Sequence, residues 1–503
     1  MTEGQANSFW WDRRCLPAAG CLAGLLLMLP SVFPVAAPVQ GVAFVPLLLA
    51  LRRVTGWRQC LYTGLLLGLG FIAPQILLLQ LPPIISLILI AYFVALLTLL
   101  AVVGRKWVRP TTIAGCFAFG ALAATLDWAT TTALPMWGTA QSFVRGWSAY
   151  PRTMAFTSVT GMSGAMFVLG ATQALLVILI LDRRRRVVGV VTLVGLLAVV
   201  AAVDLVILVQ KPVGHLKVAG VGWIFDREYG DPGHEQGFAR LYAQPVAEAA
   251  RQGARLVVSP EVAFAIYDAP QHDPFARFVE LARQHSVYLI VGYVDVRTVR
   301  NCAAFISPTE GVMGRYAKVH ITPFENSPKG DGEPVTISVD GVSVGALICH
   351  DDDYTDIARR YGDQATGVVA IPTNDWRHVR HAHLQSMIHR AIESRFAIVR
   401  AASDGISAIM APDGSILDIR DHFRDGPGLV MADVPVYHTR TIFSRYGHWF
   451  VVACTVLLVL YLVQGRRRAG VGWALAHADS PDDDKQHGLK PILPISNDAE
   501  EKT

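Results

Sequence analysis

The feature that most constrains the fold is a series of long apolar runs separated by short basic segments. A helix needs roughly 20 mostly apolar residues to cross the hydrocarbon core of a bilayer. Charged residues make up only 17% of the 503 residues, below the roughly 25% that is usual for soluble domains. We therefore predict a polytopic α-helical membrane bundle of about eight helices, near 15–31, 36–51, 59–79, 83–104, 112–132, 153–181, 187–209 and 447–464.

Basic residues lie between alternate runs and orient the predicted bundle. With eight crossings, every basic cluster falls on the same side, and Lys and Arg are retained on the cytoplasmic side. The clusters are Arg13–Arg14, Arg52–Arg53 with Arg58, Arg105–Lys106 with Arg109, Arg183–Arg186 and Arg466–Arg468. The predicted order is a cytoplasmic N-terminus (1–14), a seven-helix bundle (15–210), an extracytoplasmic domain (211–446), a last helix (447–464) and a disordered cytoplasmic tail (465–503).

The first run has a second interpretation, as a cleaved signal peptide. The further apolar runs and the lack of a small-x-small cleavage site favour a membrane helix instead. Asp127 and Asp204 are the acids inside the runs. Both are expected near the outer ends of their helices, where a carboxylate reaches water at low cost, so we expect structural rather than functional roles for them.

The segment that follows the seventh run has the pattern of an α/β domain. Short runs rich in Val, Ile and Leu alternate with the stretches 235–253, 273–285 and 380–396, in which apolar residues recur at helical spacing. Continuous apolar strands that alternate with helices indicate a sheet covered on its faces. The predicted strands include 215–223, 254–260, 287–294, 302–308, 342–349 and 367–373.

Three reactive side chains come directly after predicted strands of this domain. Glu261 follows "LVVSP", Lys318 follows "GRYA" and Cys349 follows "GALI". Ligands collect at the carboxyl ends of strands in α/β sheets, so the three side chains are candidates for one site. A carboxylate that accepts the thiol proton, a thiol that attacks a carbonyl and an ammonium that stabilises the oxyanion together suit acyl transfer.

Each of these residues also has a plain structural interpretation, and a metal site is an alternative. A cysteine at a strand end is often a small buried hydrophobic residue. A glutamate after proline caps turns, and a lysine is commonly a solvated surface charge. The histidine-rich stretch 378–389, with His350 and its neighbouring aspartates, could supply metal ligands, but its spacing matches no metal motif, so no metal is expected. No P-loop or GxSxG motif occurs, and no cofactor is expected. The scattered net charge of +4 gives no reason to expect nucleic acid.

The order Glu261, Lys318, Cys349, within "SPE", "RYAKVHITPF" and "LIC", resembles the nitrilase (carbon–nitrogen hydrolase) superfamily. The stretches "IPTNDW" (371–376) and 383–416 fit the same superfamily. With seven apolar runs before the domain and one after it, the chain is similar to the apolipoprotein N-acyltransferases, a membrane-embedded family. The stretches 44–71, 159–176 and "SRYGHWF" (444–450) add to that likeness.

The resemblance implies an αββα nitrilase-like domain and a ping-pong acyl transfer at the bacterial inner membrane. Cys349 would take an acyl chain from a membrane phospholipid as a thioester, and the N-terminal amine of a diacylated apolipoprotein would then accept it. Glu261 would act as base and then acid, and Lys318 would stabilise the tetrahedral intermediates. The resemblance favours a monomer without a cofactor.

The chain departs from the family pattern around these residues. Ser259 stands where the family usually has Trp, His350 and Asp351 replace the usual Tyr-Glu after the cysteine, and Glu325 comes one residue early. The first strand reads Val221-Gly222-Trp223 where the family typically has Gln-Gly-Asn. The outer loop reads "TALPMWGTA" where the family has a Gly-Phe-Pro-Trp-type stretch. We expect Glu325, His350, Asp351 and Asn374 to support the site or bind substrate. The departures motivate one alternative, a membrane-tethered amidase or an acyltransferase for another amine. A non-catalytic lipid- or partner-binding relative is a second alternative. A transporter is a third and is poorly supported, because the runs show no midplane charge pairs.

Overall fold

The computed structural model describes residues 16–108, 110–133, 137–224, 235–266, 273–323 and 325–478, with only the backbone at 133, 235–236 and 466–478. The predicted N-terminus (1–14), Cys15 and residues 479–503 lie outside this range. The chain forms two compact units that divide after Leu458. The first unit holds the N-terminal helices and an α/β domain.

The predicted membrane bundle with an α/β domain is confirmed, with six helices in the described part of the chain that are long and apolar enough to cross a bilayer. They span Pro34–Arg53, Trp57–Leu79, Pro83–Val108, Ile113–Thr132, Met162–Leu181 and Arg183–Leu208. Two shorter apolar helices, Leu16–Val32 and Trp449–Gly465, occupy the first and last predicted runs. The first four long spans contain α3 (Phe44–Arg53), α4 (Trp57–Leu79), α5 (Pro83–Val103) and α6 (Ile113–Trp128), and α2 spans Leu16–Val32.

Two predicted helix boundaries differ from the structure. The predicted sixth helix, 153–181, is continuous only in α8 (Met162–Leu181), because Gly161 adopts φ +69° and ends the short helix α7 (Thr157–Thr160). A side chain at this position would meet the ring of Phe443. The last helix, α17 (Trp449–Ala478), continues beyond its predicted end at 464, so the segment predicted as a tail begins in a helix.

Glycines let the bundle helices approach each other closely. A Cβ on Gly20 or Gly24 of α2 would overlap a backbone oxygen of α4, and one on Gly68 of α4 would overlap the Cα of Val94 in α5. Gly64 and Gly68 stand four residues apart, so they share one face of α4. Close backbone contact between small residues is a main source of helix packing within lipid.

The α/β domain contains two sheets that pack face to face. The first has the strand order β13-β1-β2-β4-β5-β6, with β3 beside β4, and the second has the order β12-β11-β10-β9-β8-β7. The central strands pair in parallel, β2 with β1 and β4, and β9 with β8 and β10. The first sheet comprises β1 (Gly214–Gly222), β2 (Leu256–Val258), β3 (Ala265–Ile266), β4 (Tyr288–Asp295), β5 (Arg300–Ser307), β6 (Gly311–Ala317) and β13 (Gly428–Val436). The second comprises β7 (Thr336–Val339), β8 (Val342–Ala346), β9 (Val368–Asn374), β10 (Ala397–Ser403), β11 (Ile406–Met410) and β12 (Ile416–Asp421).

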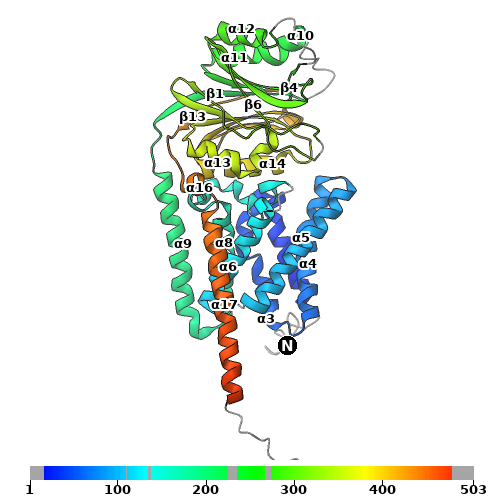
Figure 1. Ribbon diagram of the computed structural model, residues 1–503, viewed down its shortest axis with the longest axis vertical. Coiled ribbons are helices and arrows are strands. Elements are labelled where there is room, and N and C mark those ends of the chain that lie inside the picture. The colour runs from blue at the N-terminus through cyan, green and yellow to red at the C-terminus, as the bar shows by residue number, and fades with distance from the viewer. Residues whose placement is uncertain are drawn as a thin grey trace, which may run out of the picture. The chain divides into compact units, whose positions relative to one another are not determined.

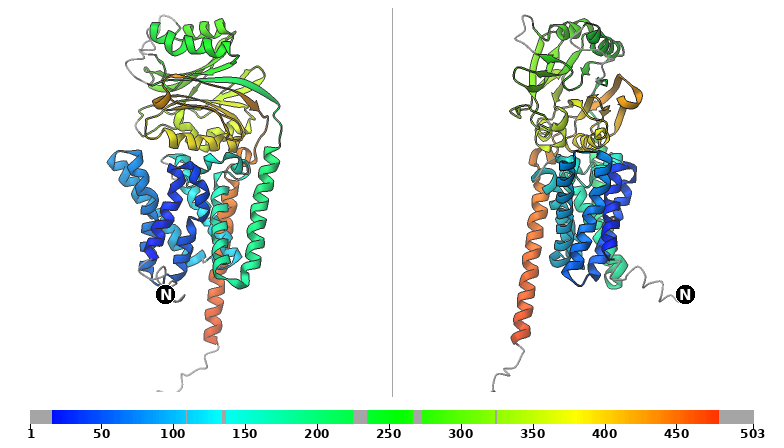
Figure 2. Two further views of the ribbon diagram at one scale, coloured as in Figure 1. Left: turned by 180° about the vertical axis from the view of Figure 1, so that it is seen from behind. Right: turned by 90° about the vertical axis from the view of Figure 1, so that its right-hand side faces the viewer.

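Helices cover both outer faces of the sheet pair and complete a four-layer αββα domain. Figures 1 and 2 show α10, α11 and α12 on the first sheet, and α13 and α14 between the second sheet and the bundle. Their bounds are α10 Glu235–Phe238, α11 Gln244–Arg251, α12 Ala276–His285, α13 Thr355–Asp363 and α14 Arg380–Ser394. The short helices α15 (His422–Asp425) and α16 (Ile442–Tyr446) follow β12 and β13.

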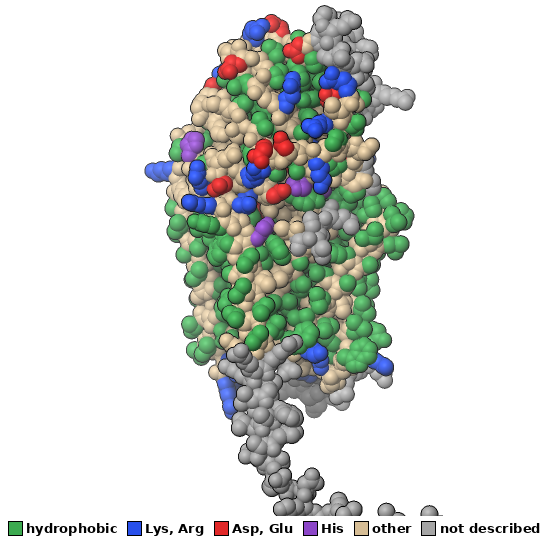
Figure 3. Space-filling view, viewed as in Figure 1, with side chains coloured by type: hydrophobic (Ala, Val, Ile, Leu, Met, Phe, Trp, Pro, Cys, Tyr) green, Lys and Arg blue, Asp and Glu red, His purple; other side chains and the backbone are tan. Residues whose placement is uncertain are grey.

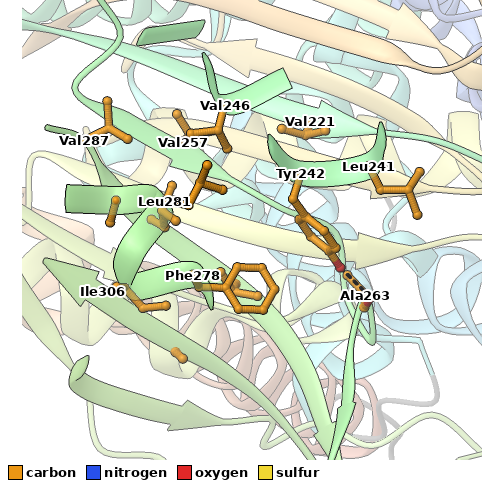
Figure 4. Close-up of a cluster of buried hydrophobic side chains, with 14 of the residues drawn as sticks. Val221, Leu241, Tyr242, Val246, Val257, Ala263, Phe278, Leu281, Val287 and Ile306 are labelled. Atoms are coloured by element: carbon orange, nitrogen blue, oxygen red, sulfur yellow. Dashed lines mark hydrogen bonds between the residues drawn. The ribbon is translucent and has the colours of Figure 1, made fainter. Parts of the chain in front are cut away.

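An aromatic and aliphatic core holds the outer helices on the first sheet. Phe278 of α12 packs edge-on against Tyr242, with ring centroids 5.0 Å apart, and Val257 of β2 lies in the same cluster (Figure 4). The Tyr242 hydroxyl donates a hydrogen bond to the backbone carbonyl of Ala263, so the one polar atom of this ring is satisfied inside the core. This contact also anchors the loop that carries Glu261.

The surface has two textures. In Figure 3 the bundle presents a broad hydrophobic band, whereas most charged side chains lie on the α/β domain and others at the far end of the bundle. Inside the bundle, Asp127 accepts hydrogen bonds from the backbone N–H of Phe143 (2.8 Å) and the hydroxyl of Ser142, and Asp204 accepts one from the backbone N–H of Phe156 (2.6 Å). Both carboxylates thus hold the segment that connects α6 to α7, in agreement with the structural roles expected for them.

Candidate active site

The three reactive side chains from separate strands line one cavity. Glu261 follows β2, Lys318 directly follows β6, and Cys349 follows β8. All three line a cavity of about 520 Å³, a size typical of ligand pockets. Glu325, His350 and Asn374 line the same cavity, whereas Asp351 does not.

Glu261 lies at the centre of a hydrogen-bond network. Its side chain is buried, and Oε1 accepts hydrogen bonds from Lys318 Nζ (2.8 Å) and Asn301 Nδ2 (2.7 Å). The other oxygen, Oε2, accepts a hydrogen bond from the backbone N–H of Asn374 (2.8 Å). These three contacts, from the end of β6, from β5 and from β9, fix the orientation of the carboxylate across both sheets.

Lys318 lies between two carboxylates. Its Nζ donates to Glu261 Oε1 and to Glu325 Oε2 (2.7 Å), and the lysine side chain is only 2% exposed. Burial disfavours the ammonium, but attraction to the Glu261 and Glu325 carboxylates outweighs it and raises the pKa of Lys318 above its ordinary value. Lys318 is therefore a fixed cation rather than a proton donor at neutral pH.

Cys349 begins a tight turn with an unusual backbone conformation. Its φ is +47°, in the left-handed region that non-glycine residues seldom occupy, and it starts the 3-10 turn η10 (Cys349–Asp353). The first N–H groups of such a turn have no partner inside the turn, so those of Cys349 and His350 can serve as oxyanion donors. Strain of this kind is typical of residues placed for function.

The thiol of Cys349 is protonated in the resting site. Burial and the nearby Glu261 carboxylate raise its pKa well above the ordinary value, although Lys318 opposes this. Its Sγ lies 3.6 Å from the backbone carbonyl of Asn374, to which the thiol donates. Attack on a carbonyl therefore requires a base, and Glu261 lines the same cavity.

Asp351 points away from the cavity and holds the backbone that follows Lys318. Its Oδ1 accepts hydrogen bonds from the backbone N–H groups of Val319 (3.1 Å) and His320 (2.7 Å), and its Oδ2 accepts one from the Tyr316 hydroxyl (2.9 Å). The His320 ring bridges Asp351 and Asp356, at 3.1 and 3.2 Å. Burial lowers the pKa of His320, but these two carboxylates raise it overall to about 9.

His350 pairs with a carboxylate on the cavity wall. Its Nδ1 lies 2.9 Å from Asp353 Oδ2, and its Nε2 lies 3.4 Å from the Tyr354 hydroxyl. The ring also packs edge-on against Trp137, with centroids 5.7 Å apart. A histidine oriented by a carboxylate is a typical arrangement for proton transfer.

A buried network of charges lies behind His350 and Cys349. His383 of α14 contacts Asp375 Oδ1 (2.7 Å) through Nδ1 and Asp352 Oδ1 (3.1 Å) through Nε2, and Arg400 of β10 pairs with Asp375. Burial opposes protonation of His383, but the surrounding carboxylates raise its pKa well above the ordinary value. The Ser386 hydroxyl donates to Asp353 Oδ1 (2.6 Å) and connects this network to the His350 pair.

This network bears on the alternative of a metal site. Among the described residues, ligand atoms of Asp352, Asp353 and His383 lie within 4.8 Å of one another, as do those of Cys349, Asp375 and His383. Both ring nitrogens of His383 already face carboxylates, so ion pairs account for the cluster. The other histidines of the predicted stretch join neither group, and His389 instead contacts the backbone carbonyl of Arg145 (3.0 Å).

No sequence pattern predicted a role for Asn301, which joins Glu261 to Glu325. Its Nδ2 donates to Glu261 Oε1 and to Glu325 Oε1 (2.9 Å). Asn301 lies at the start of β5, beside the end of the antiparallel strand β6, where the backbone N–H of Lys318 donates to the carbonyl of Asn301 (2.9 Å). The signal that the sequence offers for Asn301 is a polar residue at the start of the apolar run that precedes the strand ending just before Lys318.

The bundle supplies the other wall of the cavity. Apolar side chains of α4 and α5 line it, and the segment after α6 adds Trp137 and Arg145. Arg145 is buried and ties this segment to α14 through Gln385 Oε1 (3.1 Å). The lining residues from the two helices and their connection are Phe71, Ile72, Gln75, Leu79, Leu81, Leu89 and Phe93. The reactive groups therefore share one cavity with apolar side chains of the membrane helices.

Comparison with known proteins gives a consistent family. Residues 232–442 match the carbon-nitrogen hydrolase family model. The chain is 26% identical to an apolipoprotein N-acyltransferase of Geobacter metallireducens, in an alignment that covers 90% of this chain and 95% of that protein. It is 30% identical to the apolipoprotein N-acyltransferase of Ralstonia nicotianae over 46% of this chain and 49% of that protein, so this match spans about half of the relative's length.

Amidases are also among the proteins to which the chain is similar. An (R)-stereoselective amidase of Pseudomonas sp. is 28% identical over 28% of this chain and 55% of that protein. Among solved structures, a mutant of the amidase from Nesterenkonia sp. AN1 has a TM-score of 0.39 and 21% identity, covering 45% of this chain and 93% of that chain.

Proposed function

Because the chain belongs to the apolipoprotein N-acyltransferase family of the nitrilase superfamily, we propose that it transfers an acyl chain from a membrane phospholipid to the N-terminal amine of a diacylated lipoprotein. One observation carries the proposal. Glu261, Lys318 and Cys349 share a single cavity with apolar side chains of the membrane helices α4 and α5. A site that acts on lipid-anchored substrates needs this combination of polar chemistry and a membrane-level apolar wall.

The first half-reaction forms a thioester on Cys349. Glu261 takes the thiol proton as Sγ attacks the ester carbonyl of the phospholipid, so a C–S bond forms and the carbonyl oxygen becomes an oxyanion. Lys318 Nζ and the backbone N–H at the start of η10 stabilise that oxyanion. The C–O bond then breaks, and Glu261 returns the proton to the departing oxygen, which releases lysophospholipid.

The second half-reaction moves the acyl group to the amine. The amine nitrogen attacks the thioester carbonyl and loses a proton to Glu261, the C–S bond breaks, and the Cys349 thiolate recovers that proton. The product is an amide, and the free thiol is restored. Lys318 stabilises the second oxyanion as it did the first.

The supporting residues have different roles in this proposal. Glu325 helps Glu261 to balance the charge of Lys318, and Asn374 orients both Glu261 and Cys349 through its backbone groups. Asp351 positions the segment after Lys318. The incoming α-amine is largely an ammonium ion at pH 7, because its ordinary pKa is about 7.7–8.0. His350, oriented by Asp353, accepts this first proton before the amine attacks.

The membrane placement follows from the same proposal. The α/β domain, predicted at 211–446, lies on the extracytoplasmic side of the inner membrane, and both termini lie in the cytoplasm. The basic residues of the connections between alternate helices support this orientation. We propose that the chain acts as a monomer.

A second candidate is a membrane-tethered amidase or an acyltransferase for a different amine. His350 and Asp351, in place of the usual Tyr-Glu, favour it because they adjoin the nucleophile, and the likeness to a Pseudomonas amidase is consistent with it. Both candidates share the thioester on Cys349. They differ in the group that discharges it.

The test separates the two half-reactions. The full-length protein in detergent is incubated with phospholipid that carries a labelled acyl chain, and we expect a hydroxylamine-labile label on the Cys349 peptide. A diacylated lipopeptide with a free N-terminus should then remove the label and become acylated, whereas the same peptide with an acetylated N-terminus should not.

Two controls make the result decisive. Cys349→Ala should give no label, and Cys302→Ala, which removes another buried thiol of the same domain, should label normally. An adduct that persists in Cys349→Ala would contradict the proposed chemistry. Discharge by water or small amines, without discharge by the lipopeptide, would favour the second candidate.

A further inference from the structure

A second cavity lies beside α9 (Arg186–Leu208), the helix that leads from the bundle into β1. This helix stands at the edge of the bundle in Figures 1 and 2, and only Gly189, Asp204 and Ile207 are buried along it. The cavity has a volume of about 460 Å³ and lies at the end of α9 nearest the α/β domain. We call it the α9 groove. Its lining shares no residue with the catalytic cavity.

The α9 groove has an apolar wall and a polar end. Val199, Ala202, Val203 and Val206 stand at i, i+3, i+4 and i+7 on one face of α9, so they form a continuous apolar strip. The polar end is formed where α9 stops and the α/β domain begins. It consists of Gln210, Arg395, Thr439, Arg440 and Thr441.

Arg395 is the most informative residue of the polar end. It is only 3% exposed, yet it lies in no ion pair with any described carboxylate. Its Nη2 donates weakly to Ile207 O (3.3 Å) and Gln210 Oε1 (3.4 Å), and its guanidinium lies 4.5 Å from the centre of the Tyr437 ring. Its Nε has no hydrogen-bond partner within the described part of the chain. A buried cation in this state is expected to bind an anion.

No side chain of the lining adds a negative charge that would balance Arg395. The Asp413 carboxylate acts on Arg395 from outside the lining, where it pairs with Arg152 (3.2 Å). Arg440 adds a second, exposed guanidinium, and the described lining residues include no Asp, Glu, His or Cys. The groove therefore has the charge of an anion site but none of the groups that perform acyl-transfer chemistry. Its polarity changes from basic to apolar along α9, from the end of the helix toward its middle.

We propose that the α9 groove binds an anionic glycerophospholipid such as phosphatidylglycerol, with the phosphate held by Arg395 and Arg440 and one acyl chain along the apolar strip of α9. A phosphodiester has two free oxygens, each of which can accept hydrogen bonds from one guanidinium group. Two cations favour a lipid of net negative charge over one with a cationic head group such as choline. The basic end lies at the end of the apolar helix, where lipid head groups are found, and the strip extends from it into the hydrocarbon level. A soluble anion would use the arginines but not the valines.

Lipid in this groove would tie α9 to the catalytic domain. Arg395 directly follows α14, the helix that carries His383 and Ser386 of the buried charge network. The bound phosphate therefore acts on the far end of a helix whose near end borders the catalytic cavity. The lipid is structural in this proposal, which does not depend on acyl transfer.

The experiment uses the full-length protein in phosphatidylcholine vesicles that contain a small fraction of phosphatidylglycerol with a photoactivatable acyl chain. After illumination and proteolysis, the label is compared between α9 and α5, because α5 is also exposed along much of its length and reports ordinary lipid contact. We expect α9 to be enriched in label over α5. Excess unlabelled phosphatidylglycerol should abolish the enrichment.

Matched variants test the phosphate contacts. Arg440→Gln should reduce the enrichment on α9 several-fold, and Arg395→Gln should reduce it more, by roughly tenfold for a lost buried charged partner. Lys211→Gln removes a nearby cation that does not line the groove and should leave the labelling unchanged. Because Arg395→Gln affects a buried side chain, Val203→Trp, which fills the apolar strip, provides an independent loss of binding.

The outcomes are distinct. Equal labelling of α9 and α5, or equal effects of Arg440→Gln and Lys211→Gln, would overturn the proposal and mean ordinary contact with the bilayer. Enrichment that inorganic phosphate removes as well as phosphatidylglycerol does would mean an anion site without lipid selectivity, and it would also overturn the proposal.

Discussion

The catalytic cavity and the α9 groove each join an apolar wall of membrane helix to basic side chains of the α/β domain. They differ in what surrounds the cations. Lys318 has carboxylates at 2.8 and 2.7 Å, which balance its charge in the resting site and fix its position in the cavity. Arg395 has no carboxylate partner among the described residues and keeps its charge. In our proposals the paired Lys318 serves acyl transfer, whereas the unpaired Arg395 serves the binding of a lipid phosphate.

The largest expected effect is the loss of thioester formation in Cys349→Ala, which should leave lipid binding in the α9 groove unchanged. Cys349→Ala should abolish thioester formation, because loss of a nucleophile removes the covalent route and costs many orders of magnitude, on the order of 10⁶ in related hydrolytic chemistry. The same variant should retain the enrichment of photolabel on α9. Arg440→Gln should show the reverse pattern. If Cys349→Ala also lost the label on α9, the two cavities would not be independent, and the comparison would fail.

A smaller effect distinguishes the two carboxylates of Lys318. Glu261→Gln keeps the shape of the side chain but cannot accept the thiol proton, so thioester formation should fall by about 10²–10⁴. Glu325→Gln removes one of the two charges on Lys318 without removing the base, and we expect a loss of about tenfold. Single-turnover labelling of Cys349 measures both. Equal losses would mean that Glu261 acts only as a charge partner.

Much of the fold was predictable because two patterns in the sequence are strong, the long apolar runs and the short β-type runs. The apolar runs indicate the membrane helices, and the β-type runs indicate β1, β2, β4, β5, β8 and β9. The positions of Glu261, Lys318 and Cys349 after strands were also evident, since a reactive residue at the end of an apolar run is a local signal. Their catalytic roles stay predictions.

The remaining parts of both cavities depend on contacts between distant segments. Asn301 reaches Glu261 and Glu325 only because β5 pairs antiparallel with β6, and no sequence signal specified that pairing. Arg395 resembles an ordinary last residue of an amphipathic helix until α9 is placed beside it. The left-handed backbone conformation of Cys349 could not be predicted from the residue type either, because cysteine does not favour it.

His350 tests whether the catalytic cavity of this chain has a second proton acceptor. His350→Gln should leave thioester formation unchanged and slow discharge onto a lipopeptide amine by about tenfold at pH 7, less than the 10²–10⁴ of a sole general base. Above about pH 9 the amine is already neutral in solution, so the difference should disappear. His350→Tyr, which introduces the residue typical of the family, should behave like His350→Gln because a phenol is a poor base at pH 7. A loss that is equal in both half-reactions and at every pH would indicate a structural role.

The smallest expected effect concerns the segment that positions Lys318, which has no counterpart in the α9 groove. The pKa of His320 is raised to about 9 by Asp351 and Asp356, against an unfolded value of 6.5. The protonated ring therefore stabilises the fold fully below pH 6.5, and this contribution is lost as the pH rises through 9. His320→Gln should lower the free energy of unfolding by roughly 1–3 kcal/mol at pH 6. It should have little effect above about pH 9.5, while photolabelling of α9 stays unchanged.

Thermal unfolding in detergent at both pH values measures the effect, with His438→Gln, at an exposed histidine, as the control. A loss for His320→Gln that does not depend on pH would contradict the role of the charged ring and leave only its packing against Tyr354.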